Sequence, residues 1–212
     1  MNLRGVVVFV IVLIVCVVGV LWYKNKTFNN ILKCLKEMNY QGVLNIIDSL
    51  GCKTFFAPFN REELRLNAFF LMGDSQKISD QFDLLLNMRI SKKQKMDVVV
   101  KAFYFYVDEN NQEKALQVLN KIKTLDDDAL TSECELLYDI MLLKKTDYID
   151  MMEDYVKEAK PGFDRGMFHY LLAVQYGYLN KKKKQIEHLH VAKKDMKDTP
   201  YEIKIKQMLN EK

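Results

Sequence analysis

The segment AFYFYVDENNQEKALQVLNKI, residues 102–122, decides the fold of this chain. Its first part is rich in aromatic residues and ends in a short polar break. Its second part places apolar residues at Ala115, Val118, Leu119 and Ile122. Steps of three and four residues are typical of one face of an α-helix. The segment therefore predicts an aromatic-rich helix and a second amphipathic helix joined by a tight turn.

The same arrangement recurs along the chain at a nearly constant spacing. Gln41, Gln76 and Gln112 follow three of the breaks and lie 35 and 36 residues apart, and Tyr148 and Lys183 follow at 36 and 35 residues. This period predicts five helix pairs followed by one more helix. The predicted first helices cover residues 27–38, 61–72, 92–108, 129–144 and 164–179. The predicted second helices cover residues 40–50, 75–88, 111–124, 147–159 and 182–196, and the final helix covers residues 200–210.

Composition supports an all-α fold. The 212 residues include only 8 Gly and 3 Pro, too few for a sandwich or barrel that turns every few residues. With 49% hydrophobic, 28% charged and 11% aromatic residues, the chain is also unlike a disordered protein. A single helix pair cannot bury its apolar face alone, so we expect an α-solenoid whose last helix covers the exposed end. An irregular helical bundle is the alternative.

Local signals mark several helix ends. A short polar residue followed three positions later by Glu or Gln is typical of a helix start, and it occurs at Asn60, Ser91, Asn110 and Thr199. Pro200 then falls at the first helical position, where its missing N–H is harmless. Gly51 is predicted to end the helix that precedes it. Asp126–Asp128 is predicted to cap the following helix and to place negative charge at its start.

The N-terminal part of the chain predicts a membrane anchor. The 19 residues from Gly5 to Tyr23 contain no charged residue. As a helix they span about 28 Å at ~1.5 Å per residue, close to the ~30 Å hydrocarbon core of a bilayer. The alternative is a cleaved signal peptide, whose apolar core is shorter and ends at small residues. Here the run ends in bulky residues, which favours an uncleaved transmembrane helix, residues 1–23, followed by a repeat domain, residues 24–212.

The residues that flank this run predict how it sits in the membrane. Trp22 and Tyr23 are expected at the membrane interface, where aromatic residues concentrate. Lys24 and Lys26 follow at once, whereas only Arg4 precedes the run. This asymmetry favours a single-pass protein with its C-terminal domain in the cytoplasm.

The repeats resemble the tetratricopeptide repeat (TPR) family. Ala102-Phe103, Tyr106, Ala115, Leu119 and Ile122 match that family's small and bulky positions. Further matches are Gly73-Asp74, Phe69, Ile78, Phe82, Leu85, Leu172-Ala173, Tyr176, Leu189 and Ala192. The family's Trp near the start of each repeat and its Pro at the end are absent. We therefore describe the chain as TPR-like over residues 27–196.

The resemblance implies a concave groove formed by the first helices. Carried over position by position, its residues are Asn67, Phe70, Tyr104, Val107, Tyr138, Met141, Tyr170, Val174 and Tyr178. Such an aromatic, apolar surface suits a protein or peptide partner. The alternative is that these residues belong to the core, covered by a segment of the chain itself. The Phe55–Phe59 loop is likewise expected to be buried between repeats or to contact a partner or the membrane.

Chemical motifs do not point to an enzyme. The sequence lacks phosphate-binding, dinucleotide-binding, serine-hydrolase and zinc-protease signatures. His188 and His190 point about 200° apart on a helix and cannot share a metal. Cys34, Cys52 and Cys134 are expected to be free thiols. We therefore expect no catalytic residues, no cofactor and no metal.

The net charge of the chain does not point to nucleic acid as a partner. The formal net charge is only +4, so nucleic acid is not an expected partner. The basic run Lys181–Lys184 is interpreted as a solvated turn, with an anionic lipid surface or an acidic partner as the alternative.

These observations together predict a non-catalytic, membrane-anchored protein-protein interaction scaffold. Its partner is expected to be a membrane-associated protein or peptide, and residues 5–23 are expected to contact the lipid bilayer. The alternative is a regulatory sensor that binds a peptide or a small ligand in the groove.

Overall fold

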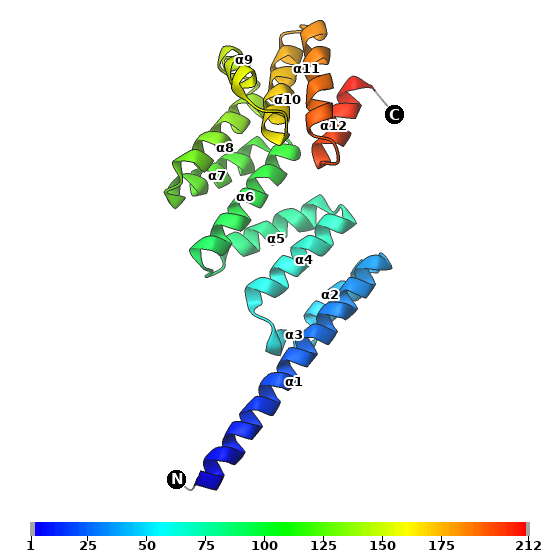
Figure 1. The fold of residues 1–212 in the computed structure, drawn as a ribbon, viewed down its shortest axis with the longest axis vertical. Coiled ribbons are helices and arrows are strands. Elements are labelled where there is room, and N and C mark those ends of the chain that lie inside the picture. The colour runs from blue at the N-terminus through cyan, green and yellow to red at the C-terminus, as the bar shows by residue number, and fades with distance from the viewer. Residues whose placement is uncertain (1–2, 211–212) are drawn as a thin grey trace. The chain divides into compact units, whose positions relative to one another are not determined.

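The computed structural model describes residues 3–210, which form twelve α-helices, one short 3-10 helix and no β-strand (Figure 1). The chain divides into two compact units, with unit 1 ending at Val98 and unit 2 beginning at Val99. The helices of unit 1 are α1 Leu3–Lys36, α2 Tyr40–Asp48, α3 Leu50–Phe55, α4 Pro58–Met72 and α5 Ser75–Asn87. Helix α6, Lys92–Asp108, crosses the boundary. Unit 2 continues with α7 Gln112–Ile122, η1 Lys123–Leu125, α8 Asp128–Met141, α9 Ile149–Glu158, α10 Phe163–Tyr178, α11 Lys182–Asp195 and α12 Pro200–Leu209.

A turn with left-handed backbone recurs after the first helix of each predicted pair. Its residues with positive φ are Met38, Gly73, Asn110, Lys144 and Asn180, with φ between 54° and 67° and separations of 35, 37, 34 and 36 residues. In four of these turns the next N–H donates to a carbonyl five residues back, as in the Schellman motif. These bonds are Asn39 to Cys34, Asp74 to Phe69, Asn111 to Tyr106 and Lys181 to Tyr176, at 2.8 to 3.3 Å. The repeat period is thus present in the local structure, whereas the stacking of the pairs into one solenoid stays a prediction.

Short polar side chains cap three of the five helices that follow these turns. Asn39, Asp74 and Asn111 each accept a hydrogen bond from the backbone N–H three residues on, as expected of N-cap residues. Ser91 and Gln94 form the predicted reciprocal pair at the start of α6, and Asp127 caps α8. The predicted cap at Asn110 is wrong by one residue, because Asn110 takes the left-handed position before Asn111.

Helix α1 is one continuous helix of 34 residues. It is long and apolar enough to cross a membrane, and no residue in its most hydrophobic window is buried within the structure. Its C-terminal part packs on α2 through a core of Ile31, Val43, Ile47 and Ala68. The predicted first helix at residues 27–38 is therefore the direct continuation of the apolar helix.

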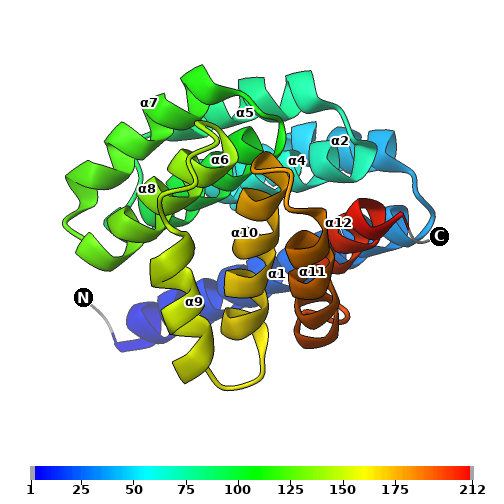
Figure 2. The same ribbon diagram turned by 90° about the horizontal axis from the view of Figure 1, so that it is seen from above.

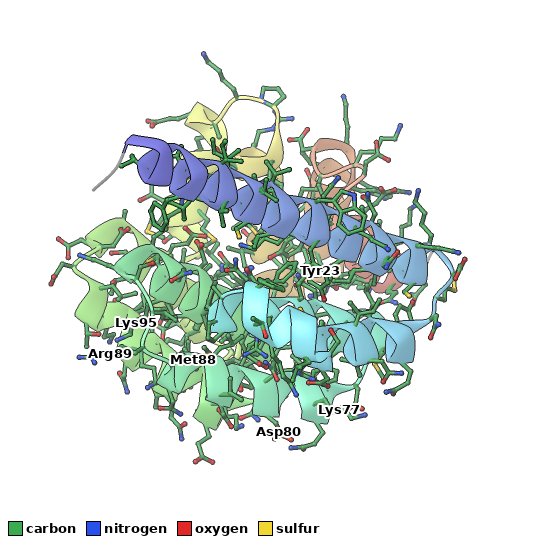
Figure 3. All side chains as sticks on the ribbon, turned by 90° about the horizontal axis from the view of Figure 1, so that it is seen from below. Tyr23, Lys77, Asp80, Met88, Arg89 and Lys95 are labelled. Carbon is green, nitrogen blue, oxygen red and sulfur yellow. The ribbon has the colours of Figure 1, made fainter. Side chains whose placement is uncertain are left out.

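Helix α3 corrects two predictions from the sequence. Gly51 does not end a helix, because α2 already ends at Asp48 and Ser49 caps α3 by accepting a hydrogen bond from Cys52 N–H. Gly51 is instead a point of close approach, since a Cβ there would overlap the ring and hydroxyl of Tyr23. In Figure 3, Tyr23 lies between α1 and the neighbouring helices of unit 1.

The Phe55–Phe59 segment is not an extended loop. Helix α3 ends at Phe55 and α4 begins at Pro58 with Ala57 as its N-cap, so the predicted helix start at Asn60 is wrong. Pro at the first position and the buried Phe59 fix this start three residues earlier. Farther along α4, the Arg65 guanidinium donates to both carboxylate oxygens of Asp48 on α2 at 2.8 and 3.2 Å, so an ion pair ties α4 to α2.

Unit 2 has its core around helix α10. Leu172, Ala173 and Tyr176 are almost completely buried. Helix α10 packs against α9 and α11, and Figure 2 shows these helices alongside it. Leu189 and Ala192 of α11 complete this part of the core. An aromatic-rich helix thus lies between two amphipathic ones, as the sequence pattern predicts.

Gln175 is a polar residue inside this core. Its side chain is 0% exposed, its amide nitrogen donates to the Leu171 carbonyl at 3.3 Å, and its Oε1 atom has no partner. An unpaired buried acceptor costs about 1–3 kcal/mol. Because Met has a similar shape, we expect Gln175→Met to raise the free energy of unfolding by about 1 kcal/mol. Urea denaturation measures this change, with the exposed Gln117→Met as the control; no gain at position 175 would contradict it.

Helix α12 lies alongside α11 and reaches back to earlier helices of unit 2 (Figure 2). Its Ile205 is completely buried. The Tyr201 ring lies 5.6 Å from the Tyr170 ring of α10, and Lys204 Nζ lies 2.5 Å from Asp108 Oδ1 at the end of α6. Helix α12 therefore covers part of the surface that α6 and α10 form.

Candidate binding pocket

Unit 2 contains an open pocket of about 790 Å³, within the usual size range of ligand sites. Side chains of α6, α8, α9, α10 and α12, together with Tyr148 just before α9, surround it. Most of them are aromatic or aliphatic. The lining residues are Tyr104, Ser132, Glu133, Glu135, Leu136, Leu137, Tyr148, Met151, Tyr155, Phe163, Asp164, Met167, Phe168, Leu171 and Tyr201.

Aromatic side chains at the pocket are held by contacts with one another. The Tyr155 ring of α9 lies 5.4 Å from the Phe168 ring of α10. The Phe163 ring, at the start of α10, lies 6.2 Å from Tyr201 of α12 in an edge-on arrangement. Tyr155 and Phe163 are nevertheless 46% and 49% exposed. Large apolar surfaces that stay exposed in this way are typical of interaction sites.

The polar groups of the pocket carry negative charge. Within the described part of the chain, its lining includes the carboxylates of Glu133, Glu135 and Asp164 and no Lys, Arg or His. Glu133 accepts a hydrogen bond from the Tyr104 hydroxyl at 2.7 Å. Glu135 pairs with Lys123, outside the pocket, at 2.6 Å. An excess of carboxylates favours ligands that carry positive charge.

The phenols of Tyr104 and Tyr148 remain protonated at neutral pH. Burial, reinforced by the neighbouring Glu133 carboxylate, raises the pKa of Tyr104 well above its usual value. The hydrogen bond to Asp139 raises the pKa of Tyr148 to about 12. Both hydroxyls therefore act as hydrogen-bond donors, and neither is activated as a nucleophile.

Asp139 positions the chain segment that leads into α9. It accepts hydrogen bonds from the Tyr148 hydroxyl and, at 2.9 Å, from Lys145 Nζ. Burial alone would raise the pKa of Asp139, but these two donors hold that pKa below its usual value. The charged carboxylate thereby fixes Tyr148 at the wall of the pocket.

The predicted groove residues differ in how far each is exposed within its own unit. In unit 1, Asn67 and Phe70 are exposed, and Phe70 packs edge-on against Phe82. In unit 2, Tyr104 is the one predicted residue that lines the pocket. Four predicted residues are buried in the core, namely Val107, Tyr138, Tyr170 and Val174. Met141 and Tyr178 are half-buried.

A second, smaller hollow brings three predicted residues together beneath α12. Val107, Met141 and Tyr170 line a space of about 470 Å³ together with Lys204 and Met208, and Asp108 and Gln207 complete it. Helix α12 thus occupies much of the surface on which these residues converge. The sequence left open the alternative that a segment of the chain itself covers these residues, and α12 is such a segment. The candidate binding surface is therefore the pocket beside α9.

Sequence reasoning missed several residues that form this pocket. Tyr155, Met167 and Phe168 were not assigned to the groove because the family register does not place them there. Tyr201 of α12 also lines the pocket and is not among the predicted groove residues either. The signal that could have identified Tyr155 is a large aromatic residue between charged neighbours in Asp154-Tyr-Val-Lys157.

The predicted interface residues of the anchor lie near the middle of α1. Trp22 is exposed, and Tyr23 and Lys24 are half-buried against unit 1. Lys26 Nζ lies 5.0 Å above the Trp22 ring. Their contact with a membrane stays a prediction.

A pair of histidines, His169 buried and His188 half-buried, lies at a different place in unit 2. His169 Nδ1 of α10 lies 2.8 Å from His188 Nδ1 of α11, and His188 stacks on Tyr176. One nitrogen must donate and the other accept, so the two rings cannot both be protonated in this arrangement. In residues 3–210 no group of three or more side chains could hold a metal ion, and the expectation that the chain binds none stays a prediction.

Comparison with protein-family models, with curated proteins and with solved structures finds no match to this chain. The resemblance to TPR proteins therefore rests on the residues quoted above, and the function is argued from the site itself.

Proposed function

We propose that the chain is a membrane-anchored, TPR-like solenoid that binds an apolar, positively flanked segment of a protein partner in the pocket of unit 2. The observation that carries this proposal is the open pocket of about 790 Å³ with exposed Tyr155 and Phe163. Large aromatic side chains contribute most strongly to protein-protein binding. The helix pairs with recurring turns supply the scaffold, and no chemical step is part of the proposal.

The charge of the pocket indicates the kind of partner. Its carboxylates complement Lys and Arg, and membrane proteins concentrate these residues in the cytoplasmic segments next to their transmembrane helices. A segment of this kind offers apolar residues followed by basic ones. We therefore propose that the partner is another membrane protein, bound through such a juxtamembrane segment.

The anchor supports this function by confining the pocket to the membrane surface. Helix α1 is long and apolar enough to span a bilayer, and in the proposal its Gly5–Tyr23 part does so, with the rest of unit 1 and all of unit 2 in the cytoplasm. Confinement raises the effective concentration of the pocket toward partners in the same membrane. Carbonate washing tests the anchor: we expect the intact protein to stay in the membrane fraction. Its release, or a mature N-terminus after Tyr23, would overturn this part of the proposal.

Replacing Tyr155 tests the pocket. We expect Tyr155→Ala to weaken binding about thirtyfold, because removal of a central aromatic side chain typically costs about 2 kcal/mol. The probe is a fluorescent amphipathic peptide with Leu on one helical face and Lys at both ends, and anisotropy with the full chain in detergent gives the affinity. Leu179 at the end of α10 is exposed and lies outside the pocket. Leu179→Ala should therefore leave the affinity unchanged. Equal losses for both variants, or none, would contradict the assignment.

A second candidate function is a sensor for a small apolar molecule. The pocket volume favours it, because drug-sized ligands fill sites of about 300–1,000 Å³. In that case the Lys-ended peptide would bind no better than a peptide with Glu at both ends. The acidic pocket predicts a clear preference for the Lys-ended peptide instead.

A further inference from the structure

Helix α3 is held against α1 at the level where the apolar part of α1 ends. The Tyr23 and Phe55 rings lie 5.2 Å apart, and Lys24 Nζ lies 5.9 Å from the centre of the Phe56 ring. At the other end of α3, Gly51 approaches Tyr23 so closely that a Cβ would not fit. Both ends of α3 are therefore fixed beside residues 23 and 24 of α1.

That level coincides with the edge of the bilayer if α1 spans it, so this inference rests on the proposed anchor. The hydrocarbon core is ~30 Å thick, and headgroups add roughly 5–8 Å on each side. Helix α3 has six residues and is about 9 Å long, which places it in or beside the headgroup layer. In Figure 1, α3 is the helix of unit 1 that lies closest to the apolar half of α1.

The exposed side chains at this level suit a lipid interface. Leu50 on α3 is 84% exposed, although Cys52 of the same helix is completely buried. Phe55 on α3 and Trp22 on α1 are exposed as well. Internal packing therefore leaves three large apolar side chains uncovered next to the end of the apolar run. Apolar side chains at this depth gain free energy by entering the headgroup and acyl boundary.

Charges around α3 also favour a membrane surface. Lys24 Nζ lies over the Phe56 ring at the end of α3, Lys26 follows two residues later on α1, and Lys53 belongs to α3 itself. The nearby Asp48 carboxylate is engaged by Arg65 through two hydrogen bonds and lies 3.9 Å from Lys53. Basic residues near the surface of a membrane are attracted to its anionic lipids.

We propose that α3 is an interfacial helix that rests on the bilayer holding α1. Leu50 and Phe55 enter the headgroup layer, and Lys24 and Lys26 contact anionic headgroups. Unit 1 is then fixed to the membrane by α1 and by α3, and the second contact resists rotation of unit 1 about the axis of α1.

The chain has a single Trp, which allows a direct test by fluorescence. In a Trp22→Phe background, Leu50→Trp places the probe on α3. Met38→Trp, in the same background, is the control, because Met38 is also exposed and lies in the turn after α1. The last residue of α1, Lys36, lies about 20 Å beyond Tyr23 at ~1.5 Å per residue. The full chain is reconstituted in phosphatidylcholine and phosphatidylserine liposomes, with and without bromine on the acyl chains.

We expect Trp at position 50 to be quenched severalfold more by brominated lipid than Trp at position 38, and to emit at shorter wavelength. Equal quenching at positions 50 and 38 would overturn the role of α3. A measurement on the unmodified chain distinguishes failure of the interfacial helix from failure of the anchor. Its Trp22 should be quenched by brominated lipid when α1 is inserted in the bilayer. A Trp22 that is not quenched would overturn the anchor and the interfacial helix together.

Discussion

Leu172→Ala is expected to lower the free energy of unfolding by about 3 kcal/mol, within the 2–5 kcal/mol range for removal of a buried Leu side chain. Leu172 is 0% exposed, and it lies in α10, which packs against both α9 and α11. The substitution leaves a cavity in the middle of three packed helices. At this chain length a change of that size lowers the melting temperature by roughly 6–12 °C.

Leu179→Ala provides the matched control for this prediction. Leu179 is the residue at the C-cap of α10, it has the same side chain, and it is 41% exposed. We expect a loss below about 1 kcal/mol there, because most of the side chain already contacts solvent. Both variants are compared as full chains in detergent by urea denaturation followed by circular dichroism. Equal losses at the two positions would show that α10 is not the core of unit 2.

Acidification is expected to destabilise unit 2 through the histidine pair. Burial, together with the neighbouring His188 and Arg165, lowers the pKa of His169 to about 4. An unfolded His has a pKa near 6.5, so between about pH 6.5 and 4 the unfolded state takes up a proton that the folded state does not. Stability is therefore complete above pH 6.5 and is lost as the pH falls, by up to about 1.4 kcal/mol per pH unit for one such His.

The pKa of His188 is shifted in the same direction as that of His169. Burial lowers its pKa despite the carboxylates of Glu187 and Glu153, which oppose the shift. Asp195 likewise opposes the shift of His169 without reversing it. Neutral rings are thus favoured in the folded state on both sides of the contact.

Urea denaturation between pH 7 and pH 5 measures this effect before most carboxylates titrate. We expect the fall in stability of the unmodified chain to be reduced in His169→Gln. His190→Gln is the control, because His190 lies on the same helix as His188 but is exposed; its pH dependence should match that of the unmodified chain. A His169→Gln variant with an unchanged slope would contradict the role assigned to the pair.

The helix pairs could be predicted because their ends depend on local chemistry. Asn39, Asp74 and Asn111 cap helices through hydrogen bonds to residues three positions away, and these signals are visible in the sequence. The all-α class and the second helices of the pairs follow from the same short-range patterns. Helix α3 was missed because it depends on Tyr23 packing against Gly51, a contact between residues far apart in the chain.

The binding surface was harder to predict for the same reason. The family register predicts which face of each first helix lines the groove, and of the residues it selects Tyr104 lines the pocket of unit 2. The register does not predict that α12 packs on this surface, where Lys204 pairs with Asp108, 96 residues earlier in the sequence. Likewise, the pairing of His169 with His188 depends on how α10 and α11 align.

Photocrosslinking tests the central claim, which is that the pocket of unit 2 holds an apolar, positively flanked segment. The Lys-ended peptide carries a photoreactive residue on its Leu face, and mass spectrometry maps its attachment to the full chain in membranes. We expect attachment at Tyr155, Met167 or Phe168, and its loss in competition with unlabelled peptide. Attachment confined to residues outside the pocket, such as those of α7 or unit 1, would contradict the claim.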